Sequence, residues 1–182
     1  MLTALACGAC QVSSVQPFYF AGDLVGPGEV AGRWGEEGPE GGVLEIGEGE
    51  GGPTWTLLEK GERSSLEVKF FRFQGVLFAD LRIPQDAVGT GDLEFWTVRT
   101  HALLKLRVAG GRLFDAVIDR DVLAAALKAG EITAAHLVED DDRIVLTGST
   151  AELQGVLGWC LAHGCFKEDA EDPGMPRLPA AP

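Results

Sequence analysis

The chain has 182 residues, the size of one ordinary domain, and 46% of them are hydrophobic, which is enough to form a buried core. Asp and Glu number 28 against 15 Lys and Arg, so the net charge is -13. This charge argues against the clustered cationic face that nucleic-acid binding requires and against electrostatic docking on anionic lipid. No apolar run approaches the roughly 20 residues of a membrane-spanning helix. We therefore expect no nucleic-acid partner, and contact with a membrane only through an attached lipid.

The N-terminal sequence MLTALACGAC is small and apolar and contains two cysteines. It resembles the end of a bacterial lipoprotein signal, in which a Cys after such a run receives the lipid. Cys7 is the better lipidation candidate and Cys10 is the alternative; the other interpretation is a disordered N-terminus with two incidental cysteines. We expect residues 1–20 to be a lipoprotein signal remnant and spacer, and the protein to be exported and anchored in the bacterial envelope, facing the periplasm.

Residues 21–53 are rich in Gly and carboxylates, which predicts turns, short edge strands and a flexible acidic loop around Glu48 and Glu50. From Thr54 onward polar and apolar residues alternate, as in strands with one buried face. Gln74-Gly75 predicts a tight hairpin turn, and residues 109–111 predict another. These segments form a meander of antiparallel strands.

Two helices are predicted in the second half of the chain. The first, over 119–130, begins at an aspartate N-cap and ends at Gly130. The second, over 149–163, begins at a capping box in which Glu152 follows Ser149 by three residues. Between them, HLVE and RIVLT predict a hairpin around the aspartates at 140–142. The tail over 167–182 is acidic and rich in proline, which predicts disorder.

Together these elements predict a mainly β fold with two helices, built as a small antiparallel β-barrel or a strongly curled meander sheet over residues 21–166. A barrel of roughly eight strands is either filled by side chains or holds one small ligand.

The segment Gly32-Arg33-Trp34 resembles the G-x-W motif at the first strand of lipocalins and related calycin barrels. The order of segments also resembles lipocalin-like domains of uncharacterised bacterial lipoproteins, with DLVGPGEVAGRW followed by LFADL (77–81), THALLK (100–105) and LTGSTAELQ (146–154). The helix over 119–130 departs from a true lipocalin, and no strand is predicted after the last helix. The resemblance implies a periplasmic or membrane-anchored, lipocalin-like β domain without an assigned chemistry.

Aromatic residues on the strands are the best candidates for a binding site, because inward-facing aromatics line the cavity in a calycin barrel. The alternative is that they fill the barrel as its core. The candidate ligand-binding residues, for a small hydrophobic ligand, are Trp34, Trp55, Phe70, Phe78, Trp96 and His101.

His101 is the one candidate for acid–base chemistry, as a base inside the barrel; a hydrogen-bonded structural histidine is the alternative. A hydrolase that uses His101 requires an Asp or Glu within hydrogen-bond reach of its ring. The sequence contains no nucleophile elbow, phosphate-binding loop, paired catalytic carboxylates or zinc-protease motif. We therefore expect a protein that is not an enzyme, with no catalytic residue and no cofactor.

The cysteines and aspartates allow two weaker metal hypotheses. Cys7, Cys10, Cys160, Cys165 and His163 supply enough ligands for zinc, but a Cys160–Cys165 disulfide fits an exported protein better. Two unpaired or locally paired thiols are the simplest interpretation and the favoured one. The aspartates at 140–142 lack the spaced oxygen ligands of a calcium loop. We expect no metal site.

The leading functional hypothesis is an exported, lipid-anchored envelope protein that binds a small hydrophobic ligand in its barrel. The alternative is a structural or protein-interaction module that presents a filled barrel to an envelope protein partner. A hydrolase based on His101 is the remote third hypothesis.

Overall fold

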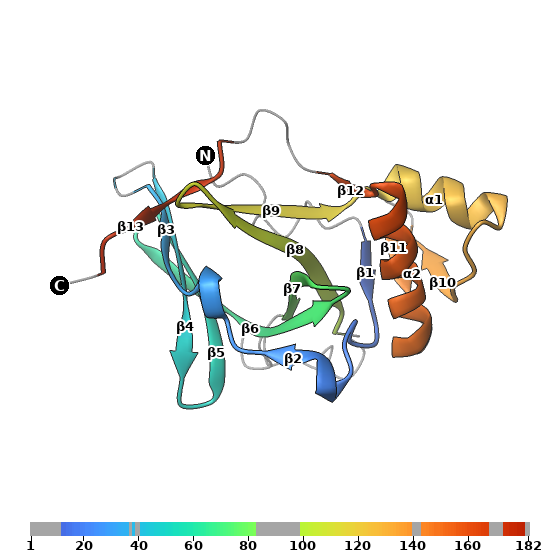
Figure 1. Cartoon of the computed structure of the whole chain (residues 1–182), viewed down its shortest axis with the longest axis horizontal. Helices are drawn as coiled ribbons and strands as arrows, with labels where there is room; N and C mark the ends of the chain where they lie inside the picture. Colours follow the sequence, from blue (N-terminus) through green and yellow to red (C-terminus); the bar gives the residue numbers. More distant parts are fainter. Residues whose placement is uncertain are drawn as a thin grey trace.

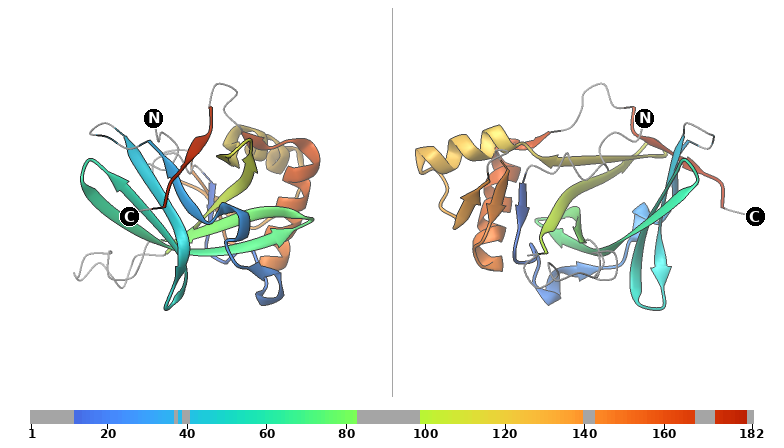
Figure 2. Two further views of the ribbon diagram at one scale, coloured as in Figure 1. Left: turned by 60° about the vertical axis from the view of Figure 1, so that its left-hand side comes forward. Right: turned by 180° about the vertical axis from the view of Figure 1, so that it is seen from behind.

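The computed structural model describes residues 12–36, 38, 41–82, 99–139, 143–167 and 173–180. Within these ranges the protein is mainly β, with a closed antiparallel barrel of eight strands and two α-helices. The barrel is the large element in Figure 1, and the helices gather at one side of it in both views of Figure 2. No helix in these ranges is long and apolar enough to span a membrane.

Seven barrel strands follow one another in the chain as a meander, as the alternating pattern predicts. The eighth, β13, comes from the C-terminal segment and lies between β3 and β9. The pairing of β8 with both β7 and β9 completes the ring. The strands are β3 (Gly32–Gly35), β4 (Gly42–Gly49), β5 (Gly52–Glu59), β6 (Glu62–Phe73), β7 (Val76–Arg82), β8 (His101–Ala109), β9 (Arg112–Ile118) and β13 (Met175–Leu178).

Further strands extend the sheet outside the barrel. From β8 the order continues through β1 (Val12–Ser14) and β11 (Ile144–Leu146) to β10 (His136–Val138), which is the edge. β1 and β11 are parallel, and the other pairs are antiparallel. The short strands β2 (Leu24–Val25) and β12 (Phe166–Lys167) pair with β6 and β9. Two 3-10 turns, η1 (Ala21–Asp23) and η2 (Gly28–Val30), precede the first barrel strand.

The predicted hairpin turns are present. Gln74 and Gly75 have φ of 50° and 81°, and Gly110 and Gly111 have φ of 57° and 73°. Two successive left-handed residues make a turn whose twist matches that of the flanking strands. These turns fix the register of β6 with β7 and of β8 with β9.

Both helices begin and end as predicted. In α1 (Arg120–Ala129) the Asp119 side chain accepts hydrogen bonds from the first turn, and left-handed Gly130 ends the helix. In α2 (Thr150–His163) Ser149 and Glu152 form the capping box, and left-handed Gly164 ends the helix.

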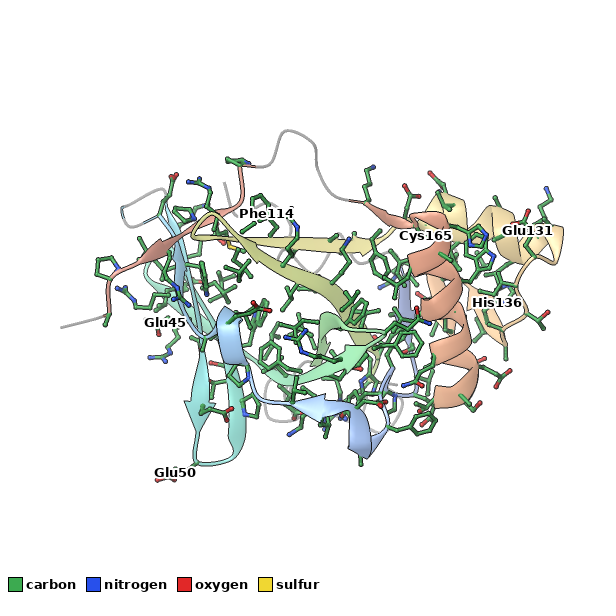
Figure 3. The ribbon with its side chains drawn as sticks, in the orientation of Figure 1. Glu45, Glu50, Phe114, Glu131, His136 and Cys165 are labelled. Carbon is green, nitrogen blue, oxygen red and sulfur yellow. The ribbon has the colours of Figure 1, made fainter. Side chains whose placement is uncertain are left out.

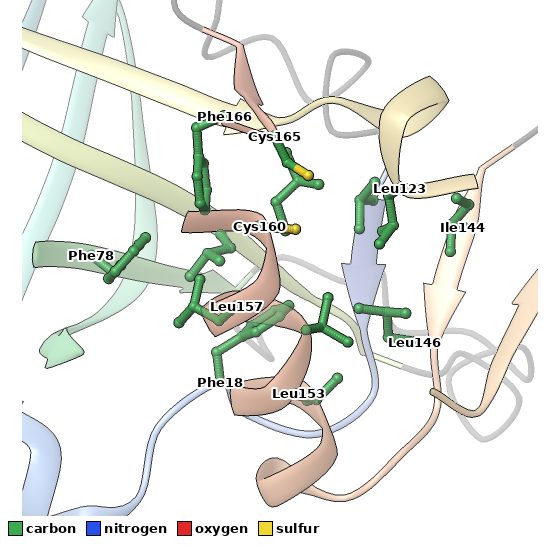
Figure 4. Close-up of a cluster of buried hydrophobic side chains, with 14 of the residues drawn as sticks. Phe18, Phe78, Leu123, Ile144, Leu146, Leu153, Leu157, Cys160, Cys165 and Phe166 are labelled. Atoms are coloured by element: carbon green, nitrogen blue, oxygen red, sulfur yellow. The ribbon is translucent and has the colours of Figure 1, made fainter. Parts of the chain in front are cut away.

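The sheet has a buried cluster of apolar side chains on each face. One fills the barrel and includes Trp34, Trp55 and Phe70. The other lies between the outer face of the sheet and the helices, where α2 contributes Leu153, Leu157 and other buried residues, as Figure 4 shows. The apolar residues of α2 recur at three- and four-residue steps, so one side of the helix packs on the sheet.

Two predictions about the ends of the domain are wrong, and a third holds only in part. Within the predicted spacer, β1 joins the sheet and Phe18 is fully buried. The region 21–53 contains the predicted turns and the short strands β2 and β3, but also a longer strand, β4, which includes Glu48 and turns into β5 near Glu50. The predicted disordered tail supplies β13, and β12 also follows the last helix. Short strands such as β12 and β13 gain most of their stability from pairing with β9 and β3, which no local pattern reports.

Candidate functional site

Three of the predicted ligand-binding residues meet inside the barrel. Trp34, Trp55 and Phe70 lie on β3, β5 and β6 and are 0%, 1% and 0% exposed. The ring centroids of Trp55 and Phe70 are 6.4 Å apart. Because other side chains cover nearly all of their surface, these aromatics are packed core residues. The same cluster contains Val30, Leu44, Ile46, Val68, Leu77, Ala79, Leu81, Leu104, Leu106 and Leu113.

Trp34 belongs to a closed end of the barrel. Its indole Nε1 donates a hydrogen bond to the Val30 carbonyl oxygen over 2.8 Å. The Arg177 guanidinium lies 4.6 Å from the centre of the Trp34 ring and donates through Nη2 to the carbonyl oxygens of Glu29 and Ala31. A strand at the end of the chain thus joins the first barrel strand to the 3-10 turn before it.

Trp55 has an unusual feature for a buried tryptophan. Its indole Nε1 makes no hydrogen bond with the described residues. A buried donor without an acceptor costs roughly 1–3 kcal/mol. An acceptor atom that reached this position would recover that free energy.

Several residues that pack against the interior cluster remain partly exposed. They are Val25, Leu66, Ala102, Val108, Val117 and Met175. Leu66 lies directly opposite Trp55 in the β5–β6 pair, and Ala102 lies opposite Leu81 in the β7–β8 pair.

Phe78 and His101 lie on the other face of the sheet. Phe78 stacks on Phe71 with a centroid distance of 5.3 Å and belongs to the cluster beneath α2. His101 is directly opposite Ser14 in the β1–β8 pair. The structure therefore separates these two residues from the three aromatics inside the barrel. Trp96, Cys7 and Cys10 lie outside the described residues.

His101 forms a buried pair with a carboxylate. Its Nδ1 is 2.5 Å from Asp80 Oδ1, and the two residues are 5% and 2% exposed. The second oxygen, Asp80 Oδ2, accepts a hydrogen bond from the Phe18 backbone N–H over 3.2 Å. Tyr19 lies near this pair. Its burial, and then the negative charge of Asp80, raise the pKa of its hydroxyl above 10.0. Asp80 thus connects the sheet to the N-terminal segment.

The carboxylate that a His101 hydrolase requires is present, and a serine is next to the histidine. The Ser14 hydroxyl, however, is fully buried and donates to the Gln16 carbonyl oxygen over 2.6 Å. A serine nucleophile must instead give its proton to the histidine and face a substrate. The geometry is that of an anchor for residues 12–18.

Two depressions are present on the outer surface of the described residues. The larger, of about 600 Å³, lies beside β3–β5 and the C-terminal segment, where Arg33, Glu45 and Arg63 line it. The smaller, of about 310 Å³, lies between α1 and the β10–β11 hairpin. The residues that line the smaller depression are Ala124, Leu127, Lys128, His136, Val138 and Ile144. Neither depression is lined by the interior aromatics.

The β10–β11 hairpin also presents the most exposed apolar side chains of the described chain. Leu137 and Val138 are 62% and 61% exposed. The hydrogen bonds from Glu139 N–H to Arg143 and from Thr147 N–H to Ala135 fix which backbone groups face β11. By the alternation of an antiparallel pair, the N–H and C=O groups of His136 and Val138 face away from β11. Figure 3 shows His136 at the far side of the molecule from Glu45.

Two of these features were missed by sequence reasoning. Asp80 shares the parity of Phe78, so its position on a buried face was open to prediction. Leu137 and Val138 are adjacent apolar residues in a short strand, and adjacent residues point to opposite faces, so one of them had to lack a core. Among the described residues, which do not include Cys7 and Cys10, the candidate zinc ligands form no group of three or more.

Comparison with known proteins gives no assignment: no family model matches the chain, and neither the curated proteins nor the solved structures contain a match.

Proposed function

We propose that this protein is a protein-interaction module, in which a filled barrel carries the exposed β10 edge as a docking site for an extended segment of a partner. The observation that carries the proposal is the pair of solvent-facing side chains at Leu137 and Val138, which lie on the edge strand of the sheet formed by the described residues. An open, apolar edge is a template for the addition of another strand.

The surroundings of the edge indicate the chemistry of the partner. A strand added beside β10 would exchange hydrogen bonds with His136 and Val138 and place alternate side chains over the depression beneath α1. The depression is apolar at Ala124 and Leu127, with the cationic Lys128 at its rim. The partner segment is therefore extended, apolar at alternate positions, and carries one carboxylate that faces Lys128.

The proposal is tested with a phage-displayed library of random peptides. Val138→Pro removes an outward N–H and leaves the β10–β11 hydrogen bonds intact, so the fold survives and strand addition fails. We expect selected peptides to lose about tenfold in affinity for Val138→Pro and for Leu137→Lys. Leu24→Lys, a charge placed on another exposed leucine, is the matched control and leaves binding unchanged.

Two results overturn the proposal. One is a selection that enriches no peptide on the native protein. The other is a set of peptides that bind the edge variants as well as they bind the native protein, because their site is then elsewhere. The native protein could also associate with itself. If Val138→Pro abolishes that association, the edge binds a second copy of the chain instead.

The exported, lipid-anchored location is part of the same proposal, with Cys7 or Cys10 as the lipidated residue. The position of Gly32-Arg33-Trp34 on the first barrel strand supports the lipocalin-like interpretation from which this location follows in part. Metabolic labelling with an alkyne fatty acid in a bacterium tests it. We expect label that Cys7→Ala or Cys10→Ala removes, and a membrane fraction free of label contradicts it.

A second candidate function, the binding of a small hydrophobic ligand, rests on the unpartnered indole N–H of Trp55. A ligand with a polar end would accept a hydrogen bond from that donor. Native mass spectrometry of gently purified protein tests it, with titration of a dansyl fatty acid as the defined probe. A bound mass that Trp55→Phe weakens supports this candidate. A bare polypeptide mass without dansyl binding rejects it.

A further inference from the structure

The end of helix α2 brings two cysteines into contact. Gly164 adopts a left-handed conformation, and the Cys165 N–H donates to the Cys160 carbonyl oxygen over 3.0 Å. This six-residue cap turns the chain back, so the side chain after the cap packs on the side chain in the last turn. Here both side chains are thiols, which form a hydrogen bond with each other. Figure 4 shows the two sulfur atoms next to each other.

The contact lies at a junction of four elements. The Cys165 carbonyl oxygen accepts a hydrogen bond from Asp119 N–H over 2.7 Å, and Asp119 is the N-cap of α1. The next residue, Phe166, begins β12 and pairs with Ile118 of β9. A covalent bond between the two sulfurs would therefore connect the end of α2 to the start of α1 and to the barrel.

The environment of the two thiols bears on the alternative of a zinc site. Both residues are fully buried in the cluster beneath α2. His163, another candidate ligand for zinc, donates a hydrogen bond from Nδ1 to the Trp159 carbonyl oxygen, and its ring stacks on Trp159. No group of three metal-ligating side chains occurs among the described residues. Within the part of the chain that the structure describes, the two thiols therefore have no third metal-ligating side chain beside them.

We propose that Cys160 and Cys165 are a redox modification site, at which an intramolecular disulfide closes across the C-terminal cap of α2. The oxidant is a disulfide-bearing molecule such as oxidised glutathione. One thiolate attacks it, forms a mixed disulfide and releases one reduced glutathione. The second thiolate then displaces the other glutathione, so the protein loses two protons and two electrons and the oxidant becomes two thiols.

The timing of this reaction follows from burial. Burial raises the pKa of both thiols, which keeps them protonated and slows their attack on a disulfide. Cys165 lies beyond the helix, so fraying of the cap exposes it before Cys160. The disulfide accordingly forms during folding or on opening of the cap, and once formed it is shielded from reductants.

Peptide mapping of the full chain tests the proposal. Trypsin cleavage after Arg143 and Lys167 gives a peptide, 144–167, that contains Cys160 and Cys165 and no other cysteine. The protein is refolded in mixtures of oxidised and reduced glutathione, quenched with acid, alkylated and digested. We expect this peptide to be unalkylated and about 2 Da lighter than the dithiol. We also expect a melting temperature about 5 °C above that of the reduced protein.

Two outcomes overturn the proposal: a peptide alkylated at both cysteines throughout the series, or one that carries only mixed glutathione disulfides. Cys165→Ala provides the matched control, because the Cys160 thiol then has no local partner. We expect the melting temperature of this variant not to depend on the redox mixture. If that variant fails to fold, the mass of the native peptide still decides the question.

Discussion

The anchor at Asp80 allows a sharp prediction about stability. The carboxylate accepts hydrogen bonds from Phe18 N–H and His101 Nδ1 in a site that is almost completely buried. Asp80→Ala leaves Phe18 N–H without an acceptor and removes the charge-assisted bond to the histidine. An orphaned buried donor costs roughly 1–3 kcal/mol and a charged hydrogen bond contributes roughly 1.5–3 kcal/mol, so we expect a loss of about 3 kcal/mol.

Asp80→Asn separates the two contributions. The amide oxygen can still accept from Phe18 N–H. The amide NH2 can donate to His101 Nδ1 once the histidine proton moves to Nε2. Both groups then keep a partner and only the charge is lost, so we expect this variant to lose about 1 kcal/mol.

Urea unfolding followed by tryptophan fluorescence measures both losses. Hydrogen exchange of the Phe18 amide is the second readout, because it reports the anchor itself: we expect faster exchange in Asp80→Ala and near-native exchange in Asp80→Asn. Equal losses for the two variants, or native protection of Phe18 in Asp80→Ala, would refute the idea that Asp80 holds the N-terminal segment on the sheet.

Three further predictions concern the helices and the strand that closes the barrel. Hydrogen bonds from Ser149 lower the pKa of Glu152 below 4.5, so the start of α2 is fully stabilised above pH 4.5 and weakens as the pH falls through the lowered pKa; Glu152→Gln flattens that dependence in acid-unfolding curves. Gly174→Ala places an alanine at a backbone φ of 70°, with its Cβ 2.7 Å from the Phe114 ring. Calorimetry should therefore show a loss of about 2 kcal/mol in the free energy of unfolding. An unchanged melting temperature contradicts the close packing of the chain before β13 against Phe114. Leu157→Ala empties a fully buried site beneath α2 and should cost about 3 kcal/mol in urea unfolding, whereas a loss below about 1 kcal/mol contradicts the packing of α2 on the sheet.

Local signals in the sequence predicted local structure well. Three features depend on residues that are neighbours in the chain and can therefore be predicted from the sequence. They are the turn at Gln74-Gly75, the capping box at Ser149 and the glycine after α1. The alternation from Thr54 onward predicted the meander for the same reason. The sequence was therefore sufficient to predict an antiparallel barrel with two helices.

The candidate sites were predicted less well, because faces and edges depend on distant segments. Trp34, Trp55 and Phe70 meet inside the barrel, whereas Phe78 and His101 lie outside it, and only the strand register separates them. The edge at β10 exists because β11 pairs with β1 on its other side, and among the described strands none lies beyond β10.

The sequence alone determined the turns, the helix caps, the mainly β class and the acidic surface, since each depends on residues that are neighbours in the chain or on simple composition. The tertiary structure decided that β13 closes the barrel, that Asp80 holds both His101 and Phe18, and that Cys160 contacts Cys165 at the joint of α2 with β12. These contacts bring together residues whose separation in the chain carries no local signal, and their free energy appears only when the whole sheet has formed.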